Sequence, residues 1–90
     1  MRQPTSVERA FLDHVWHEYL RAMAKFPAED NPVFGALIEE VGEISKALIE
    51  IPIGKAHYED LLKELVQVGA MAIRLWLHGD KAYPGSGPNA

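Results

Sequence analysis

The sequence predicts a small all-α domain, in which an N-terminal helix precedes two helices folded back on each other as an antiparallel hairpin. Apolar residues recur at helical spacing in three separate segments of the 90-residue chain. Proline or glycine stands between these segments, where helices begin and end. We therefore expect one domain over residues 1–80. Residues 81–90 contain two prolines and two glycines with little to bury, and we expect a flexible C-terminal tail there.

The first helix begins after a capping motif. Thr5 and Glu8 have the spacing of a capping box, in which each side chain accepts a hydrogen bond from the other residue's backbone N–H. We expect the helix to run from Thr5 to about Ala24, before the break at Phe26-Pro27. Its apolar stripe comprises Val7, Phe11, Val15, Tyr19, Ala22 and Met23.

The second helix is expected to begin at Asn31 and Pro32, which read as an N-cap followed by proline in the first helical position. Pro52 and Gly54 end it. Its apolar stripe comprises Phe34, Leu37, Ile38, Val41, Ile44 and Leu48.

The third helix follows directly and is expected to end before Gly79. Because the connection around Pro52 and Gly54 is so short, the second and third helices must run antiparallel and side by side. The apolar stripe of the third helix comprises Tyr58, Leu61, Leu62, Leu65, Val68, Gly69, Ala72, Ile73 and Trp76.

The composition favours self-association. A chain of this length buries only about 60% of the surface that its unfolded form exposes, and hydrophobic residues make up 48% of it. We therefore expect a homo-oligomer in which the hairpins form a four-helix-bundle-like core. The chain has no cysteine, which excludes a disulfide framework and a thiolate metal site.

The charge pattern and the N-terminus bear on location and partners. The first twelve residues lack the apolar core of a signal peptide, and no run approaches the roughly 20 apolar residues of a membrane span. We expect a cytoplasmic protein with no membrane partner. The net charge of −4 argues against polymeric nucleic acid as a partner.

Acidic side chains from both helices of the hairpin are expected to meet. Counted from the middle of the turn, Glu43 and Glu64 are equally far along their helices, and so are Glu40 and Gln67. At about 1.5 Å of rise per residue, the two pairs form neighbouring layers of one patch. Clustered carboxylates repel one another, and a hard divalent cation relieves that repulsion. We therefore expect a Mg²⁺ site, with Mn²⁺ as a substitute, made by Glu40, Glu43, Glu64 and Gln67.

A plainer interpretation stands beside this one. Glutamate is a strong helix former, and glutamates beside an apolar stripe often form only the solvated face of a helical bundle. Gly42 argues against that reading, because a glycine inside a helix costs about 0.5–1 kcal/mol relative to alanine. Close approach of another group to the backbone would explain it, although close packing of helices alone would do the same.

The motif Glu39-Glu40-Val41-Gly42-Glu43, followed by Glu64-Leu65-Val66-Gln67, resembles the EExxE…ExxD signature of MazG-like nucleoside triphosphate pyrophosphohydrolases. The resemblance covers residues 17–77. It implies an all-α enzyme that cleaves a nucleoside triphosphate between the α and β phosphates, giving a monophosphate and pyrophosphate. It further implies a homodimer or homotetramer of helical hairpins. The chain departs from the signature at Gln67, where the family usually has aspartate.

The resemblance also assigns roles to residues. It implies that Glu40, Glu43 and Glu64 bind the metal ion, and that Glu39 is an outer catalytic carboxylate that takes a second ion or orients the attacking water. For the base of the nucleotide it nominates His17, Phe26 and Met71. Lys25 and Lys46 are candidates for contact with the phosphates.

Two other functions remain open at this stage. Since a neutral amide at Gln67 lacks the charge of aspartate, the chain can be a nucleotide-binding or sequestering protein without turnover. Alternatively, the hairpin is a purely structural helical oligomer and the acidic patch has no ligand.

Overall fold

The computed structural model describes residues 1–26, 33–80 and 85–87. It contains α1 (Ser6–Lys25), α2 (Val33–Glu50) and α3 (Tyr58–His78). Over these described ranges no β-strand is present, so the all-α prediction is confirmed. The predicted cap of the second helix, Asn31 with Pro32, falls outside the described residues, and so does the side chain of Phe34.

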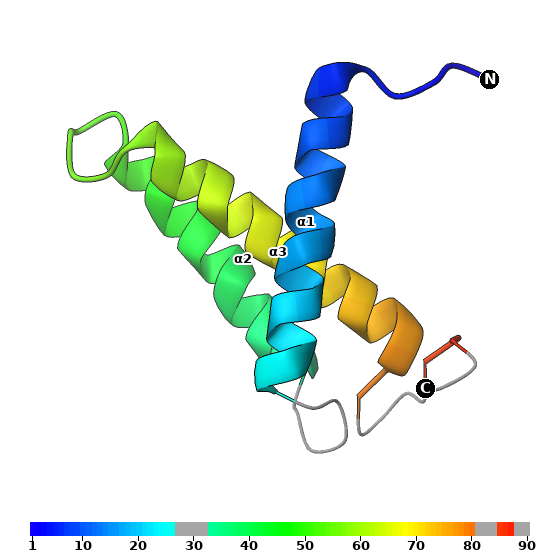
Figure 1. Cartoon of the computed structure of the whole chain (residues 1–90). Helices are drawn as coiled ribbons and strands as arrows, with labels where there is room; N and C mark the ends of the chain where they lie inside the picture. Colours follow the sequence, from blue (N-terminus) through cyan, green and yellow to red (C-terminus); the bar gives the residue numbers. More distant parts are fainter. Residues whose placement is uncertain (27–32, 81–84, 88–90) are drawn as a thin grey trace.

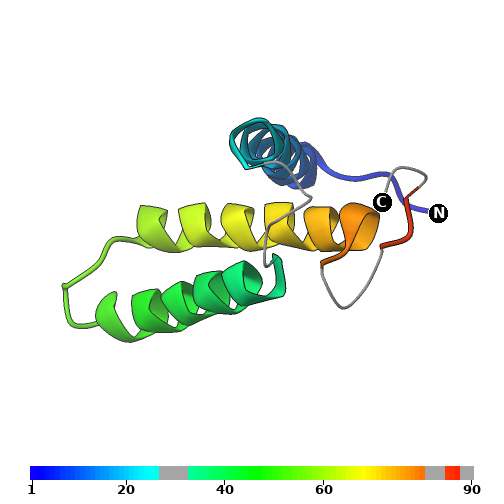
Figure 2. The same cartoon turned by 90° about the horizontal axis from the view of Figure 1, so that it is seen from below.

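The three helices form an open arrangement around α3. Helices α2 and α3 run antiparallel and side by side, as the short connection predicts, while α1 crosses α3 steeply (Figure 1). Seen along α1, α3 lies between the other two helices (Figure 2). Helix α3 packs on both neighbours, whereas α1 and α2 are not extensively packed on each other. Thus α3 is the element that brings the rest together.

The helix ends match the capping signals of the sequence. Thr5 Oγ1 accepts a hydrogen bond from the Glu8 N–H at 3.1 Å, and Glu8 Oε1 accepts one from the Thr5 N–H at 2.8 Å. Gly79 ends α3 with a φ of 68°, a conformation that suits glycine, and its N–H donates to the Leu75 carbonyl at 3.0 Å. Gly54 turns the hairpin connection with a φ of 76°.

Residues 85–87 lie against the end of α3. The Ser86 N–H and hydroxyl both donate to the Trp76 carbonyl, at 2.9 and 2.7 Å, and the Gly87 N–H donates to the Leu77 carbonyl at 3.0 Å. Carbonyls in the last turn of a helix have no partner within the helix, so this segment satisfies two of them. At these three residues, the segment expected to be a tail is bound to its own chain.

A small core forms where α1 crosses α3. Its buried members on α1 are Val15, Tyr19 and Ala22. An added Cβ at Gly69 of α3 would lie only 2.8 Å from Val15 Cγ2, so the absence of a side chain at Gly69 allows the close approach. Beside this contact, the Tyr19 hydroxyl and His78 Nε2 are 2.6 Å apart and join the two helices again.

The first half of α1 does not belong to this core. Val7 and Phe11 are expected in the apolar stripe, but Val7 is 79% exposed and Phe11 is 43% exposed. The expectation was wrong because α1 crosses α3 steeply instead of lying along it, so its N-terminal half extends beyond the other helices (Figure 1).

The face of α2 that meets α3 also differs from the expected stripe. Ala47 is buried, and Leu37, Glu40 and Ile44 are partly buried, so these positions, three or four apart, make the packed face. Ile38, Val41 and Leu48 belong to the expected stripe, yet they are exposed. Apolar residues cover two faces of α2, and α3 contacts only one of them. As a result, Glu40 lies within the packed face and not beside it.

One chain leaves much apolar surface uncovered. Its radius of gyration is 14.6 Å, against about 12 Å for a compact chain of this length. Its accessible surface is 6638 Å², against about 5,300 Å² for a monomeric protein of this mass. Large apolar side chains such as Trp16, Ile49 and Trp76 are exposed. None of the described helices is both long and apolar enough to traverse a bilayer.

Candidate functional site

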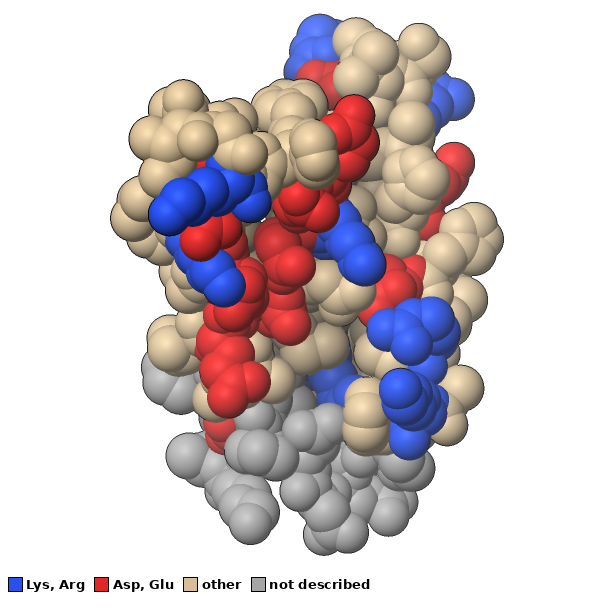
Figure 3. All heavy atoms as spheres, turned by 90° about the vertical axis from the view of Figure 1, so that its left-hand side faces the viewer, with Lys and Arg blue, Asp and Glu red and all other residues tan. Residues whose placement is uncertain are grey.

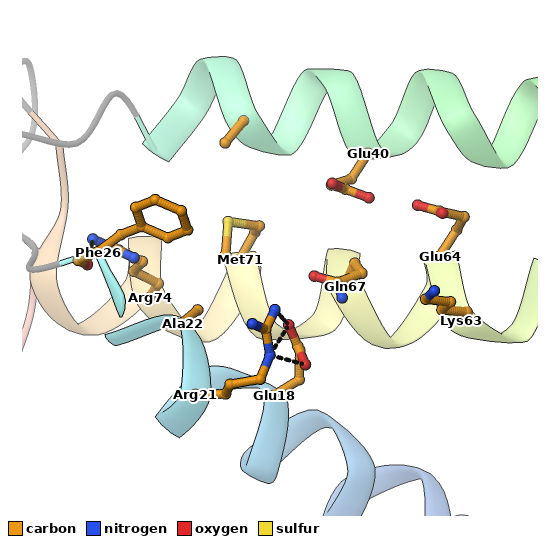
Figure 4. Close-up of a pocket in the computed structure, with 11 residues that line it drawn as sticks. Glu18, Arg21, Ala22, Phe26, Glu40, Lys63, Glu64, Gln67, Met71 and Arg74 are labelled. Carbon is orange, nitrogen blue, oxygen red and sulfur yellow. Dashed lines mark hydrogen bonds and ion pairs between the residues drawn. The ribbon is translucent and has the colours of Figure 1, made fainter. Parts of the chain in front are cut away.

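A cleft of about 440 Å³ opens where the three helices come together (Figure 4). Helix α3 supplies one wall, while α1 and α2 supply the other two. Its described lining residues are Glu18, Arg21, Ala22, Phe26, Ala36, Glu40, Lys63, Glu64, Gln67, Met71 and Arg74. Five of the residues nominated from the sequence therefore line one cleft: Phe26, Glu40, Glu64, Gln67 and Met71.

Two carboxyl groups face each other across the cleft. Glu40 projects from α2 toward Glu64 on α3 (Figure 4). The pKa of Glu40 is raised to about 7, first by the side-chain interaction with Glu64 and then by desolvation and by the charges of Glu64, Glu43 and Glu39. Two carboxylates at this separation cannot both ionise freely, so the pair holds a proton near neutral pH.

Gln67 lies one turn along α3 from this pair and connects it to α1. Its side chain lies close enough to Glu18 on α1 to help lower the pKa of that carboxyl group. Glu18 also accepts hydrogen bonds from Arg21, from Nε at 2.9 Å and from Nη2 at 2.5 Å. Arg21 first, and then Gln67, lower the pKa of Glu18. The Gln67 carbonyl oxygen remains directed into the cleft (Figure 4).

Past Gln67 the cleft becomes apolar. Met71 lies one turn further along α3, and Ala22 and Ala36 line the cleft from α1 and α2. Phe26, which follows the last residue of α1, stands at the far end with its ring facing Met71 (Figure 4). The cleft thus has an acidic end and an apolar end, which is the arrangement of many sites for amphipathic small molecules.

Arg74 closes the apolar end. It is only 1% exposed, and its Nη2 donates to the Phe26 carbonyl. Its other two nitrogens, Nε and Nη1, are buried and have no hydrogen-bond partner in the part of the chain that the structure describes. Burial lowers the pKa of the Arg74 guanidinium. A buried guanidinium with unpaired donors is costly, and such groups cluster where a ligand completes the hydrogen bonds.

The remaining predicted site residues do not line the cleft. Glu39 and Glu43 are exposed on α2 next to Glu40, and both act on it only through their charge. Lys46 is exposed further along α2. Lys25 lies outside the cleft too, with its ammonium 5.3 Å from the centre of the Phe26 ring.

His17 lines a different hollow. It lines a space together with His14, Glu18, Arg21, Leu62, Lys63, Val66 and Gln67. This hollow shares Glu18, Arg21, Lys63 and Gln67 with the cleft but contains neither Glu40 nor Glu64. His17 and Met71 were expected in one site, but they line different hollows. The crossing of α1 over α3 directs His17 away from Glu40 and Glu64.

The acidic end has the donor chemistry for Mg²⁺. In the part of the chain described here, no three acidic or histidine side chains converge as a metal-binding group. Mg²⁺ needs fewer, because it usually keeps several waters and binds one or two carboxylates together with substrate phosphates. Glu40 and Glu64, with the Gln67 carbonyl oxygen beside them, provide that set. Glu43, expected as a further ligand, is exposed and does not line the cleft.

The surface around the cleft combines both signs of charge. Viewed from the side of the hairpin, carboxylates form a band across the molecule, and lysine and arginine side chains lie on both sides of it (Figure 3). Such a face is unsuited to a polyanion but can accept a small anion that brings a metal ion.

Sequence reasoning did not find the basic residues of the cleft or Glu18. Arg21 is three residues after Glu18 on α1, a spacing that allows an ion pair but gives no sign of a site. No family model, curated protein or solved structure matches the chain.

Proposed function

We propose that the chain is a Mg²⁺-dependent nucleoside triphosphate pyrophosphohydrolase, giving a nucleoside monophosphate and pyrophosphate. The observation that supports this most directly is the meeting of Glu40 and Glu64 across the cleft. Two carboxyl groups that repel each other near neutral pH are an unfavourable arrangement for a purely structural helix pair. They suit a site that a divalent cation completes.

In this proposal Glu40 and Glu64 hold the ion, and the Gln67 carbonyl oxygen supports it. When bound, Mg²⁺ would neutralise phosphate oxygens and stabilise the negative charge that develops on them. Lys63, next to Glu64 and also lining the cleft, supplies positive charge for the phosphates that extend beyond the pair.

The apolar end of the cleft accommodates the base. Met71 and Phe26 face each other there, and an aromatic ring together with a thioether makes a favourable contact surface for a planar ring. Because these residues and the carboxyl pair belong to one cleft, a single nucleotide can contact both ends.

In this proposal Glu40 is a ligand of the ion, so its pKa of about 7 belongs to the site without Mg²⁺, and a bound cation would lower it. Proton transfer from the attacking water is therefore not assigned to Glu40. The resemblance gives the orientation of that water to Glu39, which is exposed outside the cleft in a single chain. We assign the alignment of the water to Glu39 of the assembled protein.

Product analysis tests the proposal. Purified protein is incubated with a panel of ribo- and deoxyribonucleoside triphosphates and Mg²⁺, and the products are separated by ion exchange. The proposal predicts a monophosphate and pyrophosphate in equal amounts. A diphosphate with inorganic phosphate, or no product from any nucleotide, would contradict it.

A second candidate is a nucleotide-binding protein without turnover. It is favoured by one observation: the amide of Gln67, and not a third carboxylate, stands beside the pair in the cleft. Calorimetric binding of a triphosphate in Mg²⁺, without any product after long incubation, would favour this candidate over the enzyme.

A further inference from the structure

The buried guanidinium of Arg74 lacks partners for two of its nitrogens. Arg74 is 1% exposed. Among the described residues its Nη2 is paired, with the Phe26 carbonyl, while Nε and Nη1 have no hydrogen-bond partner. Most buried polar groups in folded proteins are hydrogen-bonded, because an unpaired one costs on the order of 1–3 kcal/mol. The fold therefore maintains an unfavourable group in the wall of the cleft.

The position of Arg74 restricts what can pair with it. It lies two turns beyond Gln67 on α3, or about 10 Å along the helix axis. The lining between them, Met71 with Ala22 and Ala36, is apolar. Phosphates are better placed at the acidic end, where Lys63 lies next to Glu64. A group that reaches Arg74 therefore belongs to the apolar part of the ligand.

We propose that Arg74 recognises the base of the bound nucleotide and selects bases that present oxygen acceptors, namely guanine and uracil or thymine. The proposal rests on the nucleotide-binding function above and adds its base preference. Arginine has only N–H donors. Guanine offers O6 and N7 and thymine offers O4, both acceptors, whereas adenine and cytosine place an amino donor at the corresponding position. If an amino group of the base faced Arg74, N–H donors would face N–H donors, and neither group would have a hydrogen-bond acceptor.

A binding experiment tests the assignment without depending on turnover. Titration calorimetry of the full chain with GMP, UMP, AMP and CMP should give GMP and UMP dissociation constants about tenfold lower than those of AMP and CMP. In Arg74→Met, a substitution of similar length without donors, the four constants should become equal within about twofold. Lys63→Met is the matched control, because it removes a cation from the acidic end. It should weaken all four nucleotides and preserve the ratio.

A stability measurement distinguishes recognition from a structural role. If the free donors of Arg74 await a ligand, Arg74→Met should keep or raise the melting temperature of the unliganded chain, since an apolar side chain replaces an unpaired buried charge. A clear fall in melting temperature would overturn the assignment and mark Arg74 as structural. So would equal binding of the four nucleotides by the wild type, or an unchanged ratio in Arg74→Met. Absence of binding by any mono- or triphosphate would overturn the proposed function, and the assignment with it.

Discussion

Glu40 on α2 faces Glu64 on α3 across the cleft, and its interaction with Glu64 is the first cause of a pKa of about 7 at Glu40. The two residues lie on opposite walls of the cleft and are the only pair of carboxyl groups from different helices of the hairpin among its described lining residues. The contact therefore predicts that the stability of the hairpin depends on pH.

The first prediction concerns pH. Because the folded chain raises the pKa of Glu40 from 4.5 to about 7, it favours the protonated form. This contribution to stability is complete below about pH 4.5 and is lost as the pH rises through about 7. We expect wild type to lose roughly 1–2 kcal/mol of unfolding free energy from this source between pH 5 and pH 8, after allowance for solvent screening.

Urea unfolding at the two pH values measures this loss. In Glu64→Gln the loss should shrink, since the largest cause of the shift is gone. Glu59→Gln, which changes an exposed carboxylate on the same helix, is the control and should behave as wild type. An equal loss in Glu64→Gln and wild type would show that the pair does not interact.

The second prediction concerns Gln67. This residue lines the cleft together with Glu18, Glu40 and Glu64, so Gln67→Asp adds a negative charge close to three carboxyl groups. We expect this variant to unfold at a lower temperature than wild type without divalent ions, and to gain more stability than wild type from Mg²⁺. Gln67→Asn has the same shape without the charge and should show no added response to Mg²⁺. Equal responses in both variants would mean that the ion does not bind beside position 67.

The third prediction concerns the crossing of α1 and α3. Gly69→Ala should destabilise the chain by about 1–3 kcal/mol, because the new Cβ would lie 2.8 Å from Val15 Cγ2. The gain in helix propensity, about 1 kcal/mol, opposes this only in part. Combined with Val15→Ala, the substitution should cost less than the sum of the two single changes, measured by chemical denaturation in a double-mutant cycle. Additivity would show that the two residues do not meet.

The fourth prediction concerns oligomerisation. A single chain exposes about 1,300 Å² more surface than expected for its mass, more than the roughly 800 Å² that each partner buries in a standard interface. We expect sedimentation equilibrium to give at least a dimer of the 10.1 kDa chain. Ile38→Glu, on the open face of α2, should shift the equilibrium toward monomer, whereas Lys55→Glu in the exposed hairpin connection should not. A concentration-independent monomer for wild type would contradict the prediction.

Gly42 also bears on whether the chain forms an oligomer. The sequence suggested that something approaches its backbone, but an added Cβ there would meet nothing within 4 Å in the single chain. Close helix packing within the chain therefore does not explain this glycine. Gly42 lies on α2 between the exposed Ile38 and Ile49, and we expect a second copy of the chain to approach its backbone there.

Local signals predicted the helices well and also the meeting of Glu40, Glu64 and Gln67. The cap at Thr5, the end at Gly79 and the short turn at Gly54 act within a few residues, so the sequence contains them directly. From the hairpin turn, the register of α2 against α3 follows by counting. These are the parts of the structure that do not depend on long-range packing.

The parts that could not be predicted depend on such packing. Apolar residues cover two faces of α2, and no local pattern says that Leu37 and Ile44 meet α3 while Ile38 and Val41 stay open. The steep crossing at Gly69 decides which side of α1 meets the cleft. It brings Glu18 there and turns His17 toward another hollow.

The most direct test of the central claim is pyrophosphate release from nucleoside triphosphates by wild type and Glu64→Gln, with and without Mg²⁺. We predict release by wild type only when Mg²⁺ is present, and a loss of about 100-fold or more in Glu64→Gln, because one of the two carboxylates that hold the ion is gone. Glu59→Gln should retain the wild-type rate. Equal rates in Glu64→Gln and wild type, or no release by wild type from any nucleoside triphosphate, would contradict the account.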